Sequence, residues 1–382
     1  MKKIILISGI IGPIVGSNQS FTNTINGYLK RNYKVYHFAF FNKNNKKYDI
    51  EKLLKNKNYK FYGISKIFRI KNKNKKNVNF ITLPKSNEII IPESEINYKQ
   101  KLFYYFYNIF ETLRILFFIP FIKPDLIYSY EVFSVIPGYI ISKIINKPLI
   151  KRFQGTFINK NNIESKKINF HKKAYKKDCL LNVMANDGTK GDIVLKKLGF
   201  KEEKILFLLN GLDERMKNKL NKNNINKLKL NLNLKDKDIV LGIFNRFYPF
   251  KRVDRAFYLI NELKKFINNP YLLVGGLGGP MEMPIKKYVV DNDLEENVKF
   301  LGQIKYENMK SYYECCDIVL ILNDYANTGN QIIETSYLGK ETIAINDENN
   351  SKYLNYDNIH YINPHNFLED SVNQVINIYK KR

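Results

Sequence analysis

The sequence predicts an α/β protein of two domains, each built on a parallel sheet. Short, fully apolar segments alternate with longer segments of helical periodicity, a pattern typical of buried parallel strands joined by helices. The 382 residues are 44% hydrophobic, and at roughly 150 residues per domain they suffice for two hydrophobic cores. A polar stretch rich in Lys and Asn, residues 214–237, interrupts the alternation and marks the boundary.

The first half of the chain holds one series of predicted strands, each a short run of mainly apolar residues. They are residues 4–8, 35–40, 79–83, 126–129, 149–153, 181–184 and 205–208. Between the second and third strands, residues 42–76 are rich in Lys and Asn and only weakly periodic, so we expect them to include a surface loop. Residues 1–213 should together form the N-terminal domain.

After the linker predicted over residues 214–237, the alternation of strands and helices restarts. The strands predicted here are residues 239–244, 271–274, 298–301, 318–322, 341–345 and 359–362. We expect a C-terminal domain over residues 238–365 and a terminal helix over residues 366–382. Open α/β sheets bind ligands beyond the carboxyl ends of their strands, so two such domains predict one central cleft.

The chain is strongly basic, with 63 Lys and Arg against 36 Asp and Glu and a formal net charge of +27. Only nine of the basic residues are Arg, the side chain that bidentate recognition of bases favours. The charge therefore indicates attraction to anions such as phosphates or acidic lipids, and makes a nucleic-acid-binding protein the weakest alternative.

The sequence lacks the signatures of metalloenzymes and of hydrolases with a serine nucleophile. Its three cysteines, Cys179, Cys315 and Cys316, have neither metal-ligand spacing nor the pattern of a disulfide framework. The glycine run at residues 275–279 does not fit the dinucleotide fingerprint. We therefore expect neither a metal nor a cofactor.

Residues 102–122 form the only stretch apolar enough to suggest a membrane span, but Glu111 and Arg114 lie near its middle. Each charge costs about 2.5–3.5 kcal/mol at the centre of a bilayer, so we expect a helix that is buried or rests on a membrane. Its aromatic side chains and the net charge are compatible with peripheral attachment to an anionic leaflet. These aromatic residues are Phe103, Tyr104, Tyr105, Phe106, Phe110, Phe117 and Phe118. The expected location is cytoplasmic, with possible peripheral contact at the inner face of the plasma membrane.

Two segments of the C-terminal half carry candidate binding residues. Arg246 and Lys251 lie five residues apart where a predicted strand passes into a helix. Two fixed cations can neutralise a diphosphate and stabilise it as a leaving group without a metal. A second helix, predicted to begin near Thr328, offers free backbone N–H groups to a phosphate or to sugar hydroxyls. Glu334, further along this helix, can accept hydrogen bonds from a diol such as ribose.

In this order and spacing, residues 239–346 resemble the retaining, nucleotide-sugar-dependent glycosyltransferases of family 4. The resemblance implies the GT-B fold, in which two Rossmann-like α/β/α domains face a central cleft. It also implies that Arg246 and Lys251 hold the donor diphosphate and that Glu334 binds the ribose hydroxyls. Val298, Phe300 and Gly302 match a strand and turn of the family.

One family position departs from the pattern. The glutamate that contacts the transferred sugar in the family, eight residues before Glu334, is Ala326 here. The alternatives are a different donor sugar, a sugar held by residues 327–330, or an inactive site. The candidate contacts in that segment are Asn327, Thr328, Gly329 and Asn330.

The N-terminal half matches the family more weakly. Gly16 lies in a glycine-containing loop after the first strand, and Gln154 occupies a position where the family often has His. The resemblance places both residues near the donor sugar. Gln can hydrogen-bond a hydroxyl but cannot carry a proton. In this class the leaving diphosphate is thought to accept the proton of the acceptor, which makes the loss of that His tolerable.

The sequence therefore predicts a hexosyltransferase-type, metal-independent enzyme that moves a sugar with retention from a nucleotide-sugar donor, UDP-sugar favoured. The expected acceptor is a glycan or a lipid-linked molecule, in the assembly of a surface polysaccharide or glycolipid. Because of Ala326, a catalytically degenerate nucleotide-sugar-binding protein of the same fold remains an alternative. A nucleotide-sugar epimerase would need paired carboxylates and a His, which the sequence does not offer.

Overall fold

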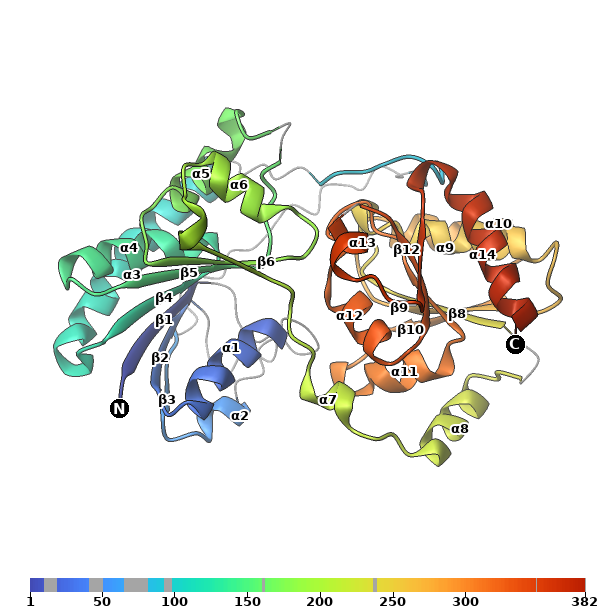
Figure 1. The fold of residues 1–382 in the computed structure, drawn as a ribbon, viewed down its shortest axis with the longest axis horizontal. Helices are drawn as coiled ribbons and strands as arrows, with labels where there is room; N and C mark the ends of the chain where they lie inside the picture. The colour runs from blue at the N-terminus through green and yellow to red at the C-terminus, as the bar shows by residue number, and fades with distance from the viewer. Residues whose placement is uncertain are drawn as a thin grey trace. The chain divides into compact units, whose positions relative to one another are not determined.

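The computed structural model describes residues 1–9, 19–40, 51–64, 82–92, 98–159, 162–235, 239–347 and 349–381. The chain forms two compact units, each with a parallel sheet and flanking helices (Figure 1). Unit 1 comprises Met1–Lys71 and Glu93–Asn210, and unit 2 comprises Asn72–Pro92 and Gly211–Arg382.

Unit 1 contains a seven-stranded parallel sheet in the order β3-β2-β1-β4-β5-β6-β7. Its strands are β1 Lys3–Gly9, β2 Lys34–Ala39, β3 Tyr59–Tyr62, β4 Leu126–Tyr130, β5 Leu149–Phe153, β6 Leu181–Ala185 and β7 Ile205–Leu208. Residues 4–7 of β1 are apolar without interruption because helices cover both faces of the strand and all four side chains are buried. The strand order reverses between β1 and β4, the point at which such sheets bind ligands.

The helices of unit 1 cover its sheet on both faces (Figure 1). They are α1 Gln19–Lys30, α2 Glu51–Leu54, α3 Tyr98–Ile122, α4 Val132–Ile144, α5 Asn169–Tyr175 and α6 Gly191–Lys197. On one face, α1 buries Phe21, Ile25 and Leu29, which are spaced by one helical turn. On the other face, Ile115 and Ile122 of α3 pack with side chains of β1 and β2.

Unit 2 contains a six-stranded parallel sheet in the order β10-β9-β8-β11-β12-β13. Its strands are β8 Ile239–Phe244, β9 Pro270–Gly275, β10 Val298–Gly302, β11 Ile318–Ile321, β12 Glu341–Ile345 and β13 Ile359–Ile362. The order reverses between β8 and β11, so their carboxyl ends define the switch point of this sheet.

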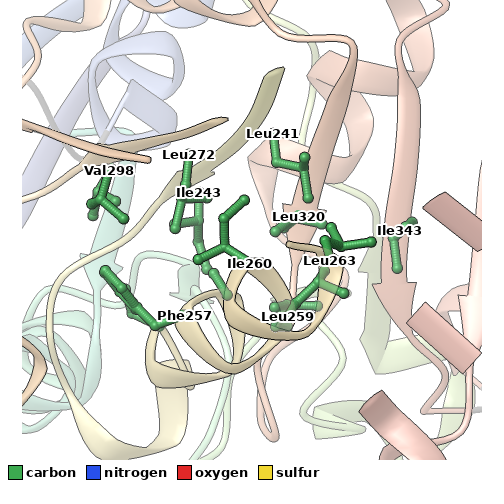
Figure 2. Close-up of a cluster of buried hydrophobic side chains, with 14 of the residues drawn as sticks. Leu241, Ile243, Phe257, Leu259, Ile260, Leu263, Leu272, Val298, Leu320 and Ile343 are labelled. Carbon is green, nitrogen blue, oxygen red and sulfur yellow. The ribbon is translucent and has the colours of Figure 1, made fainter. Parts of the chain in front are cut away.

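The helices of unit 2 are α7 Glu214–Lys217, α8 Lys222–Asn231, α9 Asp254–Leu263, α10 Glu282–Asp291, α11 Met309–Cys315, α12 Asn330–Tyr337, α13 Asn349–Tyr353 and α14 Phe367–Lys381. Figure 2 shows how α9 joins the core, with Phe257, Ile260 and Leu263 lying against side chains of the central strands. A short 3-10 helix, η3 Pro249–Lys251, precedes α9.

The predicted α/β class with two parallel sheets is confirmed, and one predicted strand is wrong in position. The third strand of unit 1 is Tyr59–Tyr62, inside the stretch predicted to include a surface loop. It is a short edge strand that buries Tyr59, so it lacks the long apolar run of a central strand. Of the strand predicted at residues 79–83, residues 79–81 lie outside the described residues, and Thr82 and Leu83 have no regular secondary structure.

The units also follow boundaries other than the predicted residues 1–213, 214–237 and 238–365. Residues 211–235, mostly predicted as linker, belong to unit 2, where α8 packs on α11 and Leu232 is buried. The predicted terminal helix is α14, which packs on α9 in the same unit.

A segment from the first half of the chain, residues 82–92, also belongs to unit 2. Arg252 donates to the carbonyl oxygens of Lys85 and Glu88, and Arg255 donates to that of Ser86. Both guanidinium groups are fully buried and pair with the Asp324 carboxylate at 3.0 and 2.6 Å. Buried charges need partners of this kind, so these two arginines hold the segment against unit 2.

Candidate functional site

The loop after β8 presents the first candidate cations. β8 is buried along its length, and the chain then passes through residues 245–248 into η3, whose first residue is Pro249. The Arg246 side chain is exposed, with its guanidinium carbon 5.3 Å from the centre of the Tyr248 ring. Lys251 is half-buried, with Nζ 5.4 Å from the centre of the Phe250 ring. Aromatic faces orient cations in this way without neutralising them.

The glycine run after β9 supports this loop. Gly276 and Gly279 have φ values of +150° and +132°, and a Cβ would lie 1.9 Å from the Asn245 carbonyl oxygen at the first and 2.2 Å from that of Phe247 at the second. The Phe247 N–H donates to the Gly278 carbonyl at 3.1 Å. Only glycine permits such close approach of two backbones. The run thus has a packing role at the switch point, which explains why it does not follow a dinucleotide fingerprint.

The segment after β11 joins the loop after β8. The Asp324 N–H donates to the Phe250 carbonyl at 3.0 Å, and Asn245 Nδ2 donates to Asn323 Oδ1 at 3.2 Å. The Gln331 side chain, in the first turn of α12, donates to the Phe244 carbonyl. The structure therefore brings together the two segments that the sequence singled out, one carrying Arg246 and Lys251 and the other carrying residues 327–330.

Two asparagines in that second segment have buried polar atoms without a partner in the described part of the chain. Asn327 is 1% exposed, and neither its Oδ1 nor its Nδ2 has a hydrogen-bond partner among the described residues. The same holds for Oδ1 of Asn330, the first residue of α12. Buried polar atoms are almost always satisfied in native proteins, and an exception points to a missing ligand, ion or water.

The other predicted residues of this segment are engaged differently. Thr328 is fully buried and its Oγ1 accepts a hydrogen bond from Asn349 Nδ2 at 3.1 Å, so its hydroxyl serves the local structure. Gly329 is the N-cap of α12 and makes no side-chain cap, which leaves the first N–H groups of the helix to other partners. α12 begins at Asn330, two residues after the predicted start near Thr328.

Ala326, at the position where the resemblance led us to expect a glutamate, has a left-handed backbone with φ of +62°. This conformation costs a residue with a Cβ about 1–2 kcal/mol. Asn323 Nδ2 donates to the Ala326 carbonyl at 3.4 Å and helps to hold it. Backbone strain of this kind persists where the surroundings fix the chain and is concentrated at functional sites.

Glu334 lies in the second turn of α12 and is 3% exposed. Its Oε1 accepts a hydrogen bond from the Tyr306 hydroxyl at 2.7 Å, and its Oε2 accepts one from Tyr313 at 3.0 Å. Burial raises the pKa of Glu334 to about 7, although the two hydroxyls favour the ionised form. Each carboxylate oxygen retains a lone pair for a further donor.

The residues around Glu334 could not be identified from the sequence. The guanidinium carbon of Arg215 lies 4.4 Å from the centre of the Tyr306 ring, and Arg215 pairs with Asp213 at 2.8 Å. Tyr306 and Arg215 come from parts of the chain with no distinctive local motif, so only their position beside Glu334 identifies them.

In unit 1, Gln154 follows β5 at the carboxyl edge of the sheet. Its backbone N–H donates to Glu131 Oε1 at 2.7 Å, and its Nε2 donates to the Tyr130 hydroxyl at 2.6 Å. The next residue, Gly155, has φ of +148°, and a Cβ there would lie 2.1 Å from Asp187 Oδ2. Gln154 is thus held in a polar cluster at this edge, whereas Gly16 lies outside the described residues.

Glu131 is a second residue that the sequence analysis missed. It directly follows β4 and has a left-handed backbone with φ of +68°. Burial raises its pKa to about 7, the N–H of Gln154 lowers it, and the charge of Asp187 raises it. In the sequence, the only indication of a site at Glu131 is its position immediately after a buried strand, and this indication is weak.

Comparison with known proteins agrees with this geometry. Residues 224–382 match the model of the family Glycosyl transferases group 1. The match covers most of unit 2. Among curated protein sequences, none matches the chain significantly.

Three solved structures extend the likeness to the whole chain. Anabaena Alr3699/HepE in complex with UDP-glucose is 17% identical, with a TM-score of 0.69 over 99% of this chain and 91% of that one. Sucrose-phosphate synthase from Thermosynechococcus elongatus is 14% identical, with a TM-score of 0.69 over 100% and 90%. WaaG, a glycosyltransferase involved in lipopolysaccharide biosynthesis, is 13% identical, with a TM-score of 0.65 over 100% and 90%. The predicted GT-B fold with two Rossmann-like domains is confirmed.

Proposed function

We propose that the protein is a retaining glycosyltransferase that moves a hexose-type sugar from a nucleotide-sugar donor, UDP-sugar favoured, to a glycan or lipid-linked acceptor. The observation that carries the proposal is the joining of two segments at the switch point of the unit 2 sheet. One segment carries Arg246 and Lys251, and the other carries the amide of Asn327 and Oδ1 of Asn330, which have no hydrogen-bond partner among the described residues. The match of this domain to group 1 and the binding of UDP-glucose by HepE support it.

In this proposal Arg246 and Lys251 bind the donor diphosphate and stabilise the charge that develops on it as the sugar leaves. Charge-assisted hydrogen bonds to phosphate are among the strongest a protein makes. Fixed donors aimed at a developing charge are worth about 10²–10³ in rate when one is removed. Two cations can thus perform the task for which other enzymes use a metal, and we propose that no metal is required.

The sugar lies, in our proposal, against residues 327–330 and the start of α12. Asn327 supplies a donor and an acceptor, and Asn330 an acceptor, that have no protein partner among the described residues. The backbone N–H groups after Gly329 replace the carboxylate that Ala326 cannot supply. Glu334 binds the ribose diol through its remaining lone pairs, with Tyr306 holding the carboxylate in place.

From unit 1 we assign Gly16 and Gln154 to the donor sugar. Because Gln154 cannot take up a proton, the leaving diphosphate accepts the proton of the attacking hydroxyl on the same face of the sugar, which gives retention. We place this reaction in surface polysaccharide or glycolipid assembly, in the cytoplasm and at the inner face of the plasma membrane.

Ala326 motivates a second candidate function, a degenerate protein that binds a nucleotide sugar without turning it over. Release of free nucleoside diphosphate from UDP-, GDP- and ADP-sugars, with a chelator present, separates the two candidates. We expect release from one donor, unaffected by chelator and lost in Arg246→Ala. A donor that raises the melting temperature without being cleaved, even with candidate acceptors added, would favour the degenerate protein. Absence of both binding and cleavage would overturn the proposed function.

A further inference from the structure

The long helix α3 has two unlike faces. One face is fixed to the sheet of unit 1, where Ile115 and Ile122 are buried in the core. On the same side, Glu111 pairs with Arg114 at 2.7 Å, and Arg114 donates to the carbonyl oxygens of Tyr62 and Ala39. Among the described residues, α3 is the one helix long and apolar enough to cross a membrane. Its attachment to the sheet instead favours a helix that lies along a surface.

The other face of α3 exposes large apolar side chains along most of the helix. Phe106, Phe117 and Phe121 are 66%, 69% and 74% exposed. Exposed side chains recur every three or four residues along this face, twice as adjacent pairs, which places them in one stripe. At 1.5 Å per residue the stripe extends for about 29 Å. It consists of Leu102, Tyr105, Phe106, Ile109, Phe110, Leu113, Phe117 and Phe121. Contiguous exposed apolar surface of this kind marks an interaction site.

A groove of about 360 Å³ lies beside the stripe, between α3, α4 and α5. It is lined almost entirely by apolar atoms, from side chains that include Ile109, Leu113, Ile136, Ile140 and Phe170. This volume is within the range of pockets that bind small molecules, and an almost wholly apolar lining suits a hydrocarbon chain rather than a sugar.

A group of lysines, here called the lysine border, lies at the groove and at the ends of α4 and α5, the helices that line it with α3. Lys143 and Lys147 are exposed at the end of α4, and Lys173 lines the groove while Lys176 is exposed just after α5. The nearby exposed Asp178 is paired with Lys204 at 2.9 Å. An apolar stripe with a lysine border is complementary to a bilayer that carries anionic headgroups.

We propose that the stripe of α3 and its lysine border dock on an anionic lipid bilayer, with α3 parallel to the membrane plane and the groove receiving a lipid hydrocarbon chain. The inference deepens the proposed function by naming a lipid-linked acceptor as the substrate class and the surface that reaches it. Docking itself does not require sugar transfer.

The topology supports a path from the groove to the carboxyl edge of the sheet in unit 1. Both α3 and α4 begin at the carboxyl edge of the sheet, since each precedes or follows a parallel strand in the usual crossover. Near that edge, Tyr104 stacks on Phe133 at 4.2 Å and on Phe170 at 5.0 Å between ring centres. A lipid with its chain in the groove can therefore present its headgroup toward the edge that carries Gln154.

Co-sedimentation with vesicles tests the docking surface. We expect the protein to sediment with vesicles of phosphatidylcholine and phosphatidylglycerol, and far less with phosphatidylcholine alone. The triple variant Phe106→Ser/Phe117→Ser/Phe121→Ser should lower the partition coefficient at least tenfold, about the effect expected from a single buried Phe. The matched control Leu230→Ser/Met283→Ser/Val290→Ser removes similarly exposed side chains from unit 2 and should leave binding unchanged.

Because the chain contains no Trp, single tryptophans report on the groove directly. With vesicles present, the fluorescence of Ile140→Trp should shift to the blue and be quenched by lipids brominated in the acyl chain, whereas that of Leu230→Trp should do neither.

Absence of vesicle binding, or equal loss of binding in the triple variant and its control, would overturn the inference. So would a concentration-dependent dimer that the triple variant abolishes, since it would identify a second copy as the occupant. Release of nucleoside diphosphate is measured separately: intact docking without donor cleavage or binding refutes the proposed function alone, and donor cleavage without docking refutes this inference alone.

Discussion

Each unit has a glutamate near the carboxyl edge of its sheet, Glu131 in unit 1 and Glu334 in unit 2. Burial raises the pKa of both glutamates to about 7. Their surroundings differ. Glu131 accepts the backbone N–H of Gln154 and lies near Asp187, whereas the segment of Glu334 joins a loop bearing Arg246 and Lys251. The same strand-edge geometry thus produces an acidic edge in unit 1 and a cationic edge in unit 2. The cationic edge suits an anionic donor, and the other edge suits a neutral hydroxyl acceptor.

Of the changes that test this difference between the units, removing the cations of unit 2 should have the largest effect on donor turnover. We expect Arg246→Ala or Lys251→Ala to lower donor turnover about 10²–10³-fold, because each removes a fixed charge from the leaving diphosphate. Release of nucleoside diphosphate measures the effect, and Lys299→Ala, at an exposed lysine of β10, should leave it unchanged. Equal losses in all three variants would contradict a specific diphosphate site.

Replacing the buried acid of unit 2 should change how stability depends on pH. Burial raises the pKa of Glu334 from 4.5 to about 7, so the folded state keeps a proton that the unfolded state releases between these values. The stabilising effect is present below pH 4.5 and lost as the pH rises toward 7. Relative to the wild type, Glu334→Gln should therefore gain about 3 kcal/mol at most between pH 4.5 and 8. Urea unfolding at several pH values measures this gain, with Glu203→Gln at an exposed residue as the control. A difference in unfolding free energy between Glu334→Gln and the wild type that does not vary with pH would refute the raised pKa of Glu334.

Replacing Asn327 should have opposite effects on the stability of the free protein and on its affinity for the donor. Asn327→Leu removes two unsatisfied buried atoms, so we expect the free protein to be stabilised by about 1–3 kcal/mol. The same change should weaken donor binding about tenfold, because the amide no longer meets the sugar. Thermal unfolding with and without the donor tests both effects. Thr328→Val, which removes a hydroxyl already bonded to Asn349, should destabilise the free protein instead. A stability loss in Asn327→Leu would indicate a protein partner for the amide.

The smallest effect is expected in unit 1. If the leaving diphosphate takes the proton, introducing the histidine that the resemblance implies at this position, Gln154→His, should change turnover by only about threefold. Gln154→Leu, which removes the hydrogen bond, should lower turnover about tenfold. Steady-state rates over a range of pH compare the two variants. A large gain in Gln154→His, with a new pH dependence near the ordinary pKa of His, would show that this position carries a proton.

The fold could be predicted largely from sequence because parallel strands are buried on both faces and appear as unbroken apolar runs. β8 and β11 are of this kind: β8 has the predicted bounds, and β11 ends one residue before its predicted end. β3 was missed because it is short, lies at the edge and is flanked by Lys and Asn. The placement of residues 82–92 in unit 2 depends on Arg252 and Arg255, whose partners are backbone carbonyls distant in the chain, so no local pattern reveals it.

Some residues of the candidate site could likewise be named from the sequence, and others could not. Arg246, Lys251 and Glu334 lie in local motifs with regular spacing, so the sequence alone could name them as candidates, and their roles stay predictions. Tyr306, Arg215 and Glu131 matter because of neighbours far away in the sequence, and only the folded chain brings those neighbours together. The exposed stripe of α3 was only partly foreseen, since an apolar helix in sequence does not reveal which of its faces the sheet covers.

The most direct test of the account is calorimetric titration of the protein with UDP, without metal. The account predicts saturable binding by the wild type and by Lys299→Ala, and loss of binding in Arg246→Ala/Lys251→Ala with the fold intact by circular dichroism. Binding of equal strength in all three proteins would contradict the assignment of the donor diphosphate to the cationic edge of unit 2.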